Sequence, residues 1–303
     1  MTTPSQHRPA PPRARARRHR ALAGAALLAL TALLAGACAD PEPPSLFADG
    51  RVAVGVKNDQ PGTGQETSYK FAGFDITVAR QVLAGVHAEP DFSSVPSQDR
   101  STVLTHHQKD LVIATYSITD ERMKAVDFVG PYATTSQGVM IREDEAGTIR
   151  SRQDLKHKRV CTWEGTTSGK ELDKPAYDDI EDYPQQDASL CIKDLEEGRA
   201  DAVSTDQMIL YGFTQEKDSH LKVVPGILFG SSNEYGIAMA KGHRADCRRL
   251  RDALRAYITS TAWEQDFANS LPAIKEQEPH WQTDFKPSTE SIDRLSCRDH
   301  PAA

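Results

Sequence analysis

The sequence predicts an α/β fold of two lobes, and two observations indicate it. Short β-branched strands alternate with amphipathic helical patterns, which is typical of a sheet covered by helices. The chain of 303 residues is also long enough for two modest lobes after its N-terminal segment is set aside. The predicted elements of the first part are a strand over 51–56, a helix over 73–83, a strand over 90–95, a helix over 100–109 and a strand over 111–115.

The first predicted helix has a recognisable start. Gly73 and Phe74 precede Asp75, and a short acidic side chain at this position is placed to cap the helix. The last predicted strand, Leu111 to Thr115, is short and rich in branched residues. Polar turn residues follow it, and they carry the first candidate site.

The N-terminal segment predicts export. Residues 1–37 combine an arginine-rich start with an apolar run of small residues and Leu, too short and too rich in Ala and Gly for a typical membrane span. Ala37-Cys38 resembles the end of a bacterial lipobox, so we expect cleavage before Cys38 and its lipidation. Residues 38–50 would then tether the protein to the outer face of the cytoplasmic membrane. The alternative is a plain signal peptide cut near Ala37, which leaves Cys38 as an unpaired thiol.

The other four cysteines predict two disulfides, because an exported chain folds where disulfides form. Cys161 ends a predicted strand and Cys191 begins a predicted helix, while Cys247 and Cys297 both lie in the C-terminal region. Of the three pairings we predict Cys161–Cys191 and Cys247–Cys297. The alternative is that one or both pairs stay reduced as buried thiols. No spacing is CxxC, which argues against a zinc or redox site.

The charge excludes a nucleic-acid partner. Six of the 36 basic residues and none of the 43 acidic residues lie in residues 1–37, so the rest of the chain has 30 basic against 43 acidic residues, a net charge of −13. Such a chain repels phosphate backbones, and it shows no basic stripe with interleaved aromatic residues. An anionic ligand would need a few local cations.

The segment 111–132 predicts a carboxylate-binding turn. The strand runs into Ser117 and Thr119 and then into a helix start that includes Arg122. Backbone N–H groups at a helix start and the planar fork of an arginine both suit a carboxylate. The alternative is that Arg122 is an ordinary solvated arginine in the first turn of a helix.

The same segment resembles the signature of solute-binding protein family 3, the polar amino-acid-binding lipoproteins of ABC importers. It reads ATYSITDER over 114–122 and VDFVGPY over 126–132, against a family pattern of ATxSITxER followed by VDFxxPY. The resemblance covers about 51–267 and implies the type II periplasmic-binding-protein fold, two α/β lobes joined by two crossover strands. It also implies that Arg122 holds the α-carboxylate of the ligand, helped by Ser117 and Thr119.

Two motifs of the second lobe also resemble the family. WEGTTS over 163–168 is similar to its GTT(S) loop, which implies that Thr167, with Thr166 beside it, donates to the ligand carboxylate. GRADAVSTD over 198–206 is similar to GRxDAVxxD, which implies that Asp206 receives the α-ammonium group. The alternative for Asp206 is a cap of the helix that follows.

The first loop bears on the side chain of the ligand. It departs from the PPF that is common in the family, and KNDQPG over 57–62 resembles the glutamate-binding members instead. The resemblance implies that Lys57 meets a side-chain carboxylate, so that the ligand is L-glutamate, then aspartate or glutamine. The alternative is that Lys57 is an exposed residue at a strand end.

The resemblance also divides the chain. Segments 136–141 and 233–239 fit the two crossings. Pro272, Pro279 and Pro287, with a scatter of polar residues, suggest an extended tail fastened by Cys297. The expected parts are a signal peptide over 1–37, a tether over 38–50, lobe 1 over 51–136 and 235–270, lobe 2 over 137–234 and a C-terminal extension over 271–303.

A binding protein, not an enzyme, is therefore predicted, with an ABC permease and an ATPase as partners and no cofactor or metal. Two alternatives stay open: a ligand-sensing lipoprotein of the same fold, and a periplasmic enzyme that resembles cyclohexadienyl dehydratase. The pair His106-His107 lies on a polar helical pattern, and we interpret it as a solvated surface pair.

Overall fold

The computed structural model describes residue 2 and residues 43–298. The predicted signal peptide over 1–37 and the lipidation site Cys38 lie outside the described residues. Within the described part, no helix is long and apolar enough to cross a membrane.

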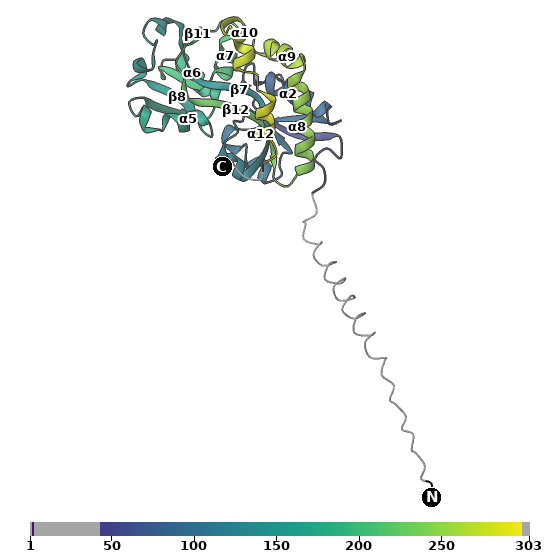
Figure 1. Cartoon of the computed structure of the whole chain (residues 1–303). Helices are drawn as coiled ribbons and strands as arrows, with labels where there is room; N and C mark the ends of the chain where they lie inside the picture. The colour runs from purple at the N-terminus through teal and green to yellow at the C-terminus, as the bar shows by residue number, and fades with distance from the viewer. Residues whose placement is uncertain (1, 3–42, 299–303) are drawn as a thin grey trace. The chain divides into compact units, whose positions relative to one another are not determined.

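One nine-stranded sheet runs through the fold in the order β5-β1-β6-β12-β7-β10-β8-β9, and β11 pairs with β7 (Figure 1). A hairpin sheet, β2-β3-β4, stands apart from it. The strands are β1 (Arg51–Val56), β2 (Asp59–Gln60), β3 (Gly64–Thr67), β4 (Lys70–Ala72), β5 (Glu89–Ser94), β6 (Leu111–Val112), β7 (Val126–Arg142), β8 (Arg159–Trp163), β9 (Glu181–Gln185), β10 (Ala202–Asp206), β11 (Leu221–Val223) and β12 (Phe229–Ala240).

Helices cover both ends of this sheet. The helices are α2 (Phe74–Ala84), α3 (Thr102–Thr105), α4 (Asp120–Ala125), α5 (Thr167–Leu172), α6 (Ala188–Glu196), α7 (Gln207–Thr214), α8 (Arg244–Thr259), α9 (Ala262–Ser270), α10 (Pro272–Gln277), α11 (Trp281–Asp284) and α12 (Thr289–Leu295). The α/β prediction is confirmed.

The two lobes are the two ends of the sheet. In lobe 1, β1 pairs in parallel with β5 and β6, and α2 packs against α8 and α9. In lobe 2, β8 pairs in parallel with β9 and β10, and α5 and α6 pack on these strands. Val52, Val54 and Val56 of β1 are all fully buried, as expected for a parallel strand with its neighbours and helices around it.

Two long antiparallel strands, β7 and β12, join the lobes (Figure 1). Near its start β7 pairs with the part of β12 that also pairs with β6, and from Gln137 onward it pairs with β10. The segments expected to cross, 136–141 and 233–239, lie within these two strands. Two α/β lobes joined by two crossover strands are the predicted fold class, which is confirmed.

The predicted cap of the first helix is wrong. Gly73 is the N-cap residue of α2, with φ at 119°, and Asp75 makes no cap hydrogen bond. Glycine is required at this position, because a Cβ atom on Gly73 would lie 2.4 Å from the carbonyl oxygen of Thr63. The carboxyl of Asp75 instead turns inward toward the crossover strand β7.

The predicted helix over 100–109 is also shorter than expected. A 3-10 turn over Ser97–Asp99 precedes α3. Arg100, which follows the turn, directs its side chain inward and donates from Nε to the carbonyl oxygen of Ser97. Arg100 therefore lies outside the helix, and its buried side chain bonds back to the 3-10 turn.

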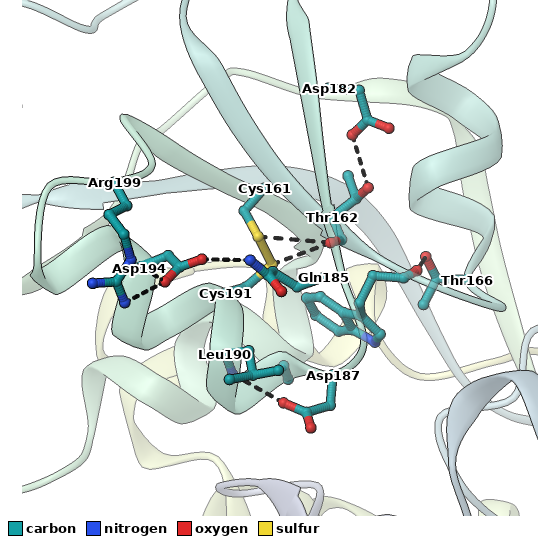
Figure 2. Close-up of a disulfide and its surroundings, with 12 residues drawn as sticks. Cys161, Thr162, Thr166, Asp182, Gln185, Asp187, Leu190, Cys191, Asp194 and Arg199 are labelled. Carbon is teal, nitrogen blue, oxygen red and sulfur yellow. Dashed lines mark hydrogen bonds and ion pairs between the residues drawn. A yellow bond between two sulfur atoms is a disulfide. The ribbon is translucent and has the colours of Figure 1, made fainter.

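Both predicted disulfides are present. Cys161–Cys191 joins β8 to α6 and closes a sequence separation of 30 residues (Figure 2). Cys247–Cys297 joins α8 to the segment after α12 over a separation of 50 residues. The first bond joins two elements of lobe 2, and the second fastens the C-terminal segment to α8.

The expectation of an extended C-terminal tail is wrong, since residues 272–295 contain three short helices. The cause is apolar burial: Trp281, Phe285 and Ile292 are almost fully buried. Trp281 stacks on Phe267 of α9 with ring centroids 5.4 Å apart. The prolines begin or separate these helices and do not prevent them.

This C-terminal segment lies along the crossover strands (Figure 1). The N–H of Thr134 on β7 donates to the carbonyl oxygen of Phe285 at 2.9 Å. Arg294 of α12 pairs with Glu234 of β12 at 3.3 Å, and the hydroxyl of Ser296 accepts from the N–H of Gly130 at 3.0 Å. The extension therefore contacts both strands that join the lobes.

We expect the double substitution Cys247→Ser and Cys297→Ser to lower the free energy of unfolding by about 2–4 kcal/mol, because it frees a long loop in the unfolded chain. Urea unfolding of the wild type and the variant measures this difference. An unchanged midpoint and slope would contradict the expected contribution of the bond.

Candidate functional site

A small polar cavity lies between the lobes. Its walls come from β2 and the turns after β5 and β6 on one side, and from β8, α5, β10 and α7 on the other. The lining residues are Gln60, Ser97, Arg100, Thr115, Ser117, Trp163, Thr166, Thr167, Ser168, Thr205, Asp206 and Ile209.

Arg100 is a buried cation in this wall, with 2% of its surface exposed. Its guanidinium donates to four carbonyl oxygens: Ser97, Ala114 and Thr115 in lobe 1 and Gly165 in lobe 2, at 2.9–3.0 Å. Burial and, next, the charge of Arg122 lower the pKa of Arg100 to about 9, so it stays charged at neutral pH. Sequence reasoning missed this residue.

Arg122, in the first turn of α4, lies beside Arg100. Its Nη1 donates to the carbonyl oxygen of Ser117 at 2.8 Å and its Nη2 to that of Gly165 at 2.9 Å. Arg100 and Arg122 both lie 4.5 Å from the ring centroid of Tyr116. Burial lowers the pKa of Arg122, and nearby Tyr116 and Asp206 oppose that effect.

Thr119 supports Arg122 and does not line the cavity. It is the N-cap residue of α4, and its hydroxyl accepts from the backbone N–H of Arg122 at 3.2 Å. Ser117 does line the cavity and is 3% exposed. The predicted turn therefore has one residue in the wall and one that positions the arginine.

The hydroxyl-rich loop of lobe 2 forms the facing wall. Thr166 caps α5 by accepting from the N–H of Gly169, and its hydroxyl donates to the carbonyl oxygen of Trp163 at 2.7 Å (Figure 2). Thr167 follows at the start of α5 and also lines the cavity. Both predicted threonines thus reach the cleft.

Asp206 ends β10 inside the cleft. Its two oxygens accept from Nδ2 of Asn233 and from the hydroxyl of Tyr235, each at 2.6 Å. Burial raises the pKa of Asp206 while these hydrogen bonds and then Arg122 oppose the rise. Asp206 is the N-cap residue of α7 but makes no side-chain cap bond, so the cap interpretation is not supported.

Lys57 is placed differently from the expectation. It is 2% exposed and does not line the cavity, and its Nζ pairs with Asp59 at 3.3 Å. Burial lowers the pKa of Lys57, and Asp59 opposes this. Asp59 also accepts from the N–H of Ala188, the first residue of α6, at 3.0 Å. Lys57 therefore belongs to a contact between lobes, and the alternative of an exposed lysine is wrong.

Of the seven predicted ligand-binding residues, four line the cavity: Ser117, Thr166, Thr167 and Asp206. Several of the missed lining residues lie at or just after strand ends: Ser97 and Arg100 follow β5, Thr115 follows β6, and Trp163 ends β8. Ligands of open α/β folds bind at the carboxyl ends of parallel strands, and this rule was the signal that could have found them. Among the described residues no cluster of His, Cys, Asp or Glu could hold a metal ion.

The comparison with known families decides the identity of this fold and cleft. Residues 52–277 match the model of the bacterial extracellular solute-binding proteins, family 3. The chain belongs to this family. The family is one of solute-binding proteins, so the alternative of a dehydratase-like enzyme is not supported. The matched residues include the whole cavity wall.

Individual relatives agree with the family. The chain is 31% identical to the glutamate-binding protein GluB of Corynebacterium efficiens over 69% of this chain and 74% of that protein. It is 29% identical to the glutamine-binding protein GlnH of Bacillus subtilis over 68% and 75%. An ancestral arginine-binding protein bound to arginine superposes with a TM-score of 0.66 at 28% identity, over 73% of this chain and 98% of that one.

A buried carboxyl lies directly behind the cavity wall. Asp75 is fully buried, and its oxygens accept from the N–H of Thr115 at 2.8 Å and from the hydroxyl of Tyr132 at 2.7 Å. Burial raises the pKa of Asp75 to about 7 against these two bonds. It thereby links the cavity residue Thr115 to the crossover strand β7.

We expect Asp75 to make the protein less stable as pH rises from about 4 to about 7. Because its folded-state pKa lies above the ordinary value, the folded chain holds a proton in this window that the unfolded chain has lost. The free-energy cost of ionising the buried Asp75 is absent below about pH 4, is complete above about pH 7, and is on the order of 4 kcal/mol. Urea unfolding of wild type and Asp75→Asn across this range measures it.

The substitution removes the titrating group, so the difference between the two free energies of unfolding isolates Asp75 from the histidines and other carboxylates. The wild type should lose stability relative to the variant up to about pH 7 and then run parallel to it. A difference that stays constant from about pH 4 to pH 8 would show that Asp75 ionises normally.

Proposed function

We propose that this chain is the extracytoplasmic substrate-binding component of an ABC importer and that it captures an acidic amino acid, L-glutamate. Its family supports solute binding, and the glutamate- and glutamine-binding relatives support an amino acid. The closed protein would deliver its ligand to a membrane permease that a cytoplasmic ATPase drives.

The charge of the cleft is the observation that carries glutamate. Arg100 supplies one cation to the cavity wall, and Asp206 is the one carboxylate among the lining residues. Arg122 is not itself a lining residue but lies beside Arg100, because both donate to the carbonyl oxygen of Gly165. Lys57 adds no free charge because Asp59 pairs with it. Glutamate has two carboxylates and one ammonium, so it complements this set, whereas arginine would add a cation to a site with an excess of cations.

The α-groups of the ligand have defined partners in this proposal. Arg122 takes the α-carboxylate with Ser117 and Thr167, since only two of its five N–H groups have protein acceptors. Asp206 takes the α-ammonium, and Asn233 holds the orientation of its carboxylate. Aspartate has the same charges on a shorter side chain and glutamine lacks one charge, so both rank after glutamate.

Lobe closure completes the site in this proposal. In this proposal the lobes divide at about residues 136 and 235, near Gln137, where β7 begins to pair with β10. Gly165 of lobe 2 then lies against lobe 1, and a Cβ atom on it would be 2.5 Å from the backbone of Gln98. Both arginines donate to its carbonyl oxygen, so this close contact joins the two cations to the second lobe.

Export and anchoring remain part of the proposal. Cleavage at Ala37 and lipidation of Cys38 would hold the protein on the outer face of the cytoplasmic membrane, near the permease. A chain with Cys38→Ala should be released from cells that retain the wild-type protein.

We expect isothermal titration to give the tightest binding for L-glutamate, weaker binding for L-aspartate and L-glutamine, and little or none for L-arginine. Arg122→Ala should weaken glutamate binding by about a hundredfold or more, because the α-carboxylate is then buried without its cation. Tighter binding of arginine than of glutamate would overturn the charge argument, and binding of no amino acid would overturn the proposed function.

We also expect Gly165→Ala to weaken ligand binding by about tenfold to a hundredfold, because the added methyl group holds the lobes apart. Gly226→Ala is the matched control. Gly226 has φ of 76° against 75° for Gly165, so both variants carry the same backbone strain, but nothing lies within 4 Å of a Cβ atom on Gly226. Equal affinities of the two variants would show that this contact does not govern closure.

A further inference from the structure

Two donors in the cavity wall have no partner in the protein. Within the described residues six buried side-chain atoms lack a hydrogen bond, and two of them, Nε1 of Trp163 and Oγ of Ser97, belong to residues that line the cavity. Trp163 is 2% exposed. An indole N–H can only donate, and leaving it buried and unbonded is unfavourable.

The structure points to Trp163 as a specificity residue: we propose that its indole N–H donates to a side-chain oxygen of the bound ligand. The inference rests on the proposed function and deepens it, because it names a group that meets the side chain of the ligand. Nothing in the sequence patterns marks this tryptophan.

The surroundings of Trp163 indicate why the partner is a carboxylate oxygen. The loop that follows it meets lobe 1 at Ser97, because a Cβ atom on Gly165 would lie 2.7 Å from the carbonyl carbon of that residue. Arg100 bonds to the carbonyl oxygens of Ser97 and Gly165 and has used four of its five N–H groups. Ser97, Arg100 and Trp163 all line the cavity, and this corner of it offers a hydroxyl, a cation and an indole N–H.

Donors dominate this corner, and that property separates ligands. A carboxylate oxygen can accept from both lobes at once, from Ser97 in lobe 1 and from Trp163 in lobe 2. A side-chain ammonium or guanidinium would bring more donors to the same place and leave the indole unpaired. The corner selects an oxygen acceptor at the end of the side chain, and Arg100 favours the charged form.

The indole is also held firmly enough to discriminate. Trp163 ends β8, where it pairs in register with Gln185 of β9, and Thr166 fixes its carbonyl oxygen. Its ring belongs to the main buried apolar cluster of the protein. Because the indole is held in one position, it loses little conformational entropy on binding a ligand oxygen that lies within hydrogen-bond distance. It also cannot move to bond an oxygen that lies elsewhere.

Two replacements at this position test the proposal by isothermal titration with L-glutamate. Trp163→Phe removes the N–H but also shrinks the ring, while 3-benzothienylalanine at position 163 keeps the ring size and replaces the N–H by sulfur. Both should weaken glutamate binding by about tenfold to a hundredfold, as expected for a hydrogen bond to a charged group. The matched control is Trp281→Phe, because Trp281 is a buried tryptophan outside the cavity. The Trp281→Phe protein should bind L-glutamate with the affinity of the wild type.

The outcomes separate this proposal from the proposed function. If the wild type and the benzothienylalanine protein bind glutamate equally well, the proposed role of the N–H is overturned and the proposed function is not affected. Wild type that binds no amino acid overturns the function and this inference with it. A loss in both position-163 proteins, with the Trp281→Phe protein unchanged, supports the inference.

Discussion

The burial of one guanidinium organises the cleft. Arg100 cannot leave its charge unpaired inside the protein, and lobe 1 alone gives it only three carbonyl oxygens, those of Ser97, Ala114 and Thr115. The fourth comes from Gly165 of lobe 2. Satisfying this cation thus brings the second lobe against the first, and the same contact demands a residue without a side chain at position 165.

A second consequence is the sign of the site. Arg100 and Arg122 stack on Tyr116 at equal distances and share the carbonyl oxygen of Gly165. Two like charges this close repel each other, so an anion between them is favoured. Residues 38–303, which include the cleft, have a net charge of −13, so the two neighbouring cations are a local exception to the general charge of the protein.

Sequence patterns predicted those parts of the fold and the site that depend on local order. The α/β alternation and the turn with Ser117 and Arg122 follow from neighbouring residues, and the even number of cysteines left in an exported chain indicated the two disulfides. The environment of Lys57 was not predicted, because it depends on the second lobe: its partner Asp59 also accepts from the N–H of Ala188 in α6. Arg100 was not predicted either: the sequence analysis only placed it at the start of a helix, and its burial depends on tertiary contacts with Ala114, Thr115 and Gly165.

The C-terminal segment shows the same dependence on tertiary contacts. Its prolines and polar residues predict an extended tail, but the family model ends at residue 277 and the helices beyond it fold against the crossover strands. Phe285 and Ser296 bond to β7, Arg294 pairs with β12, and Cys297 is held by a disulfide. These contacts support both crossover strands along one side, so any change in the angle between the lobes that bent these strands would also have to strain the C-terminal segment.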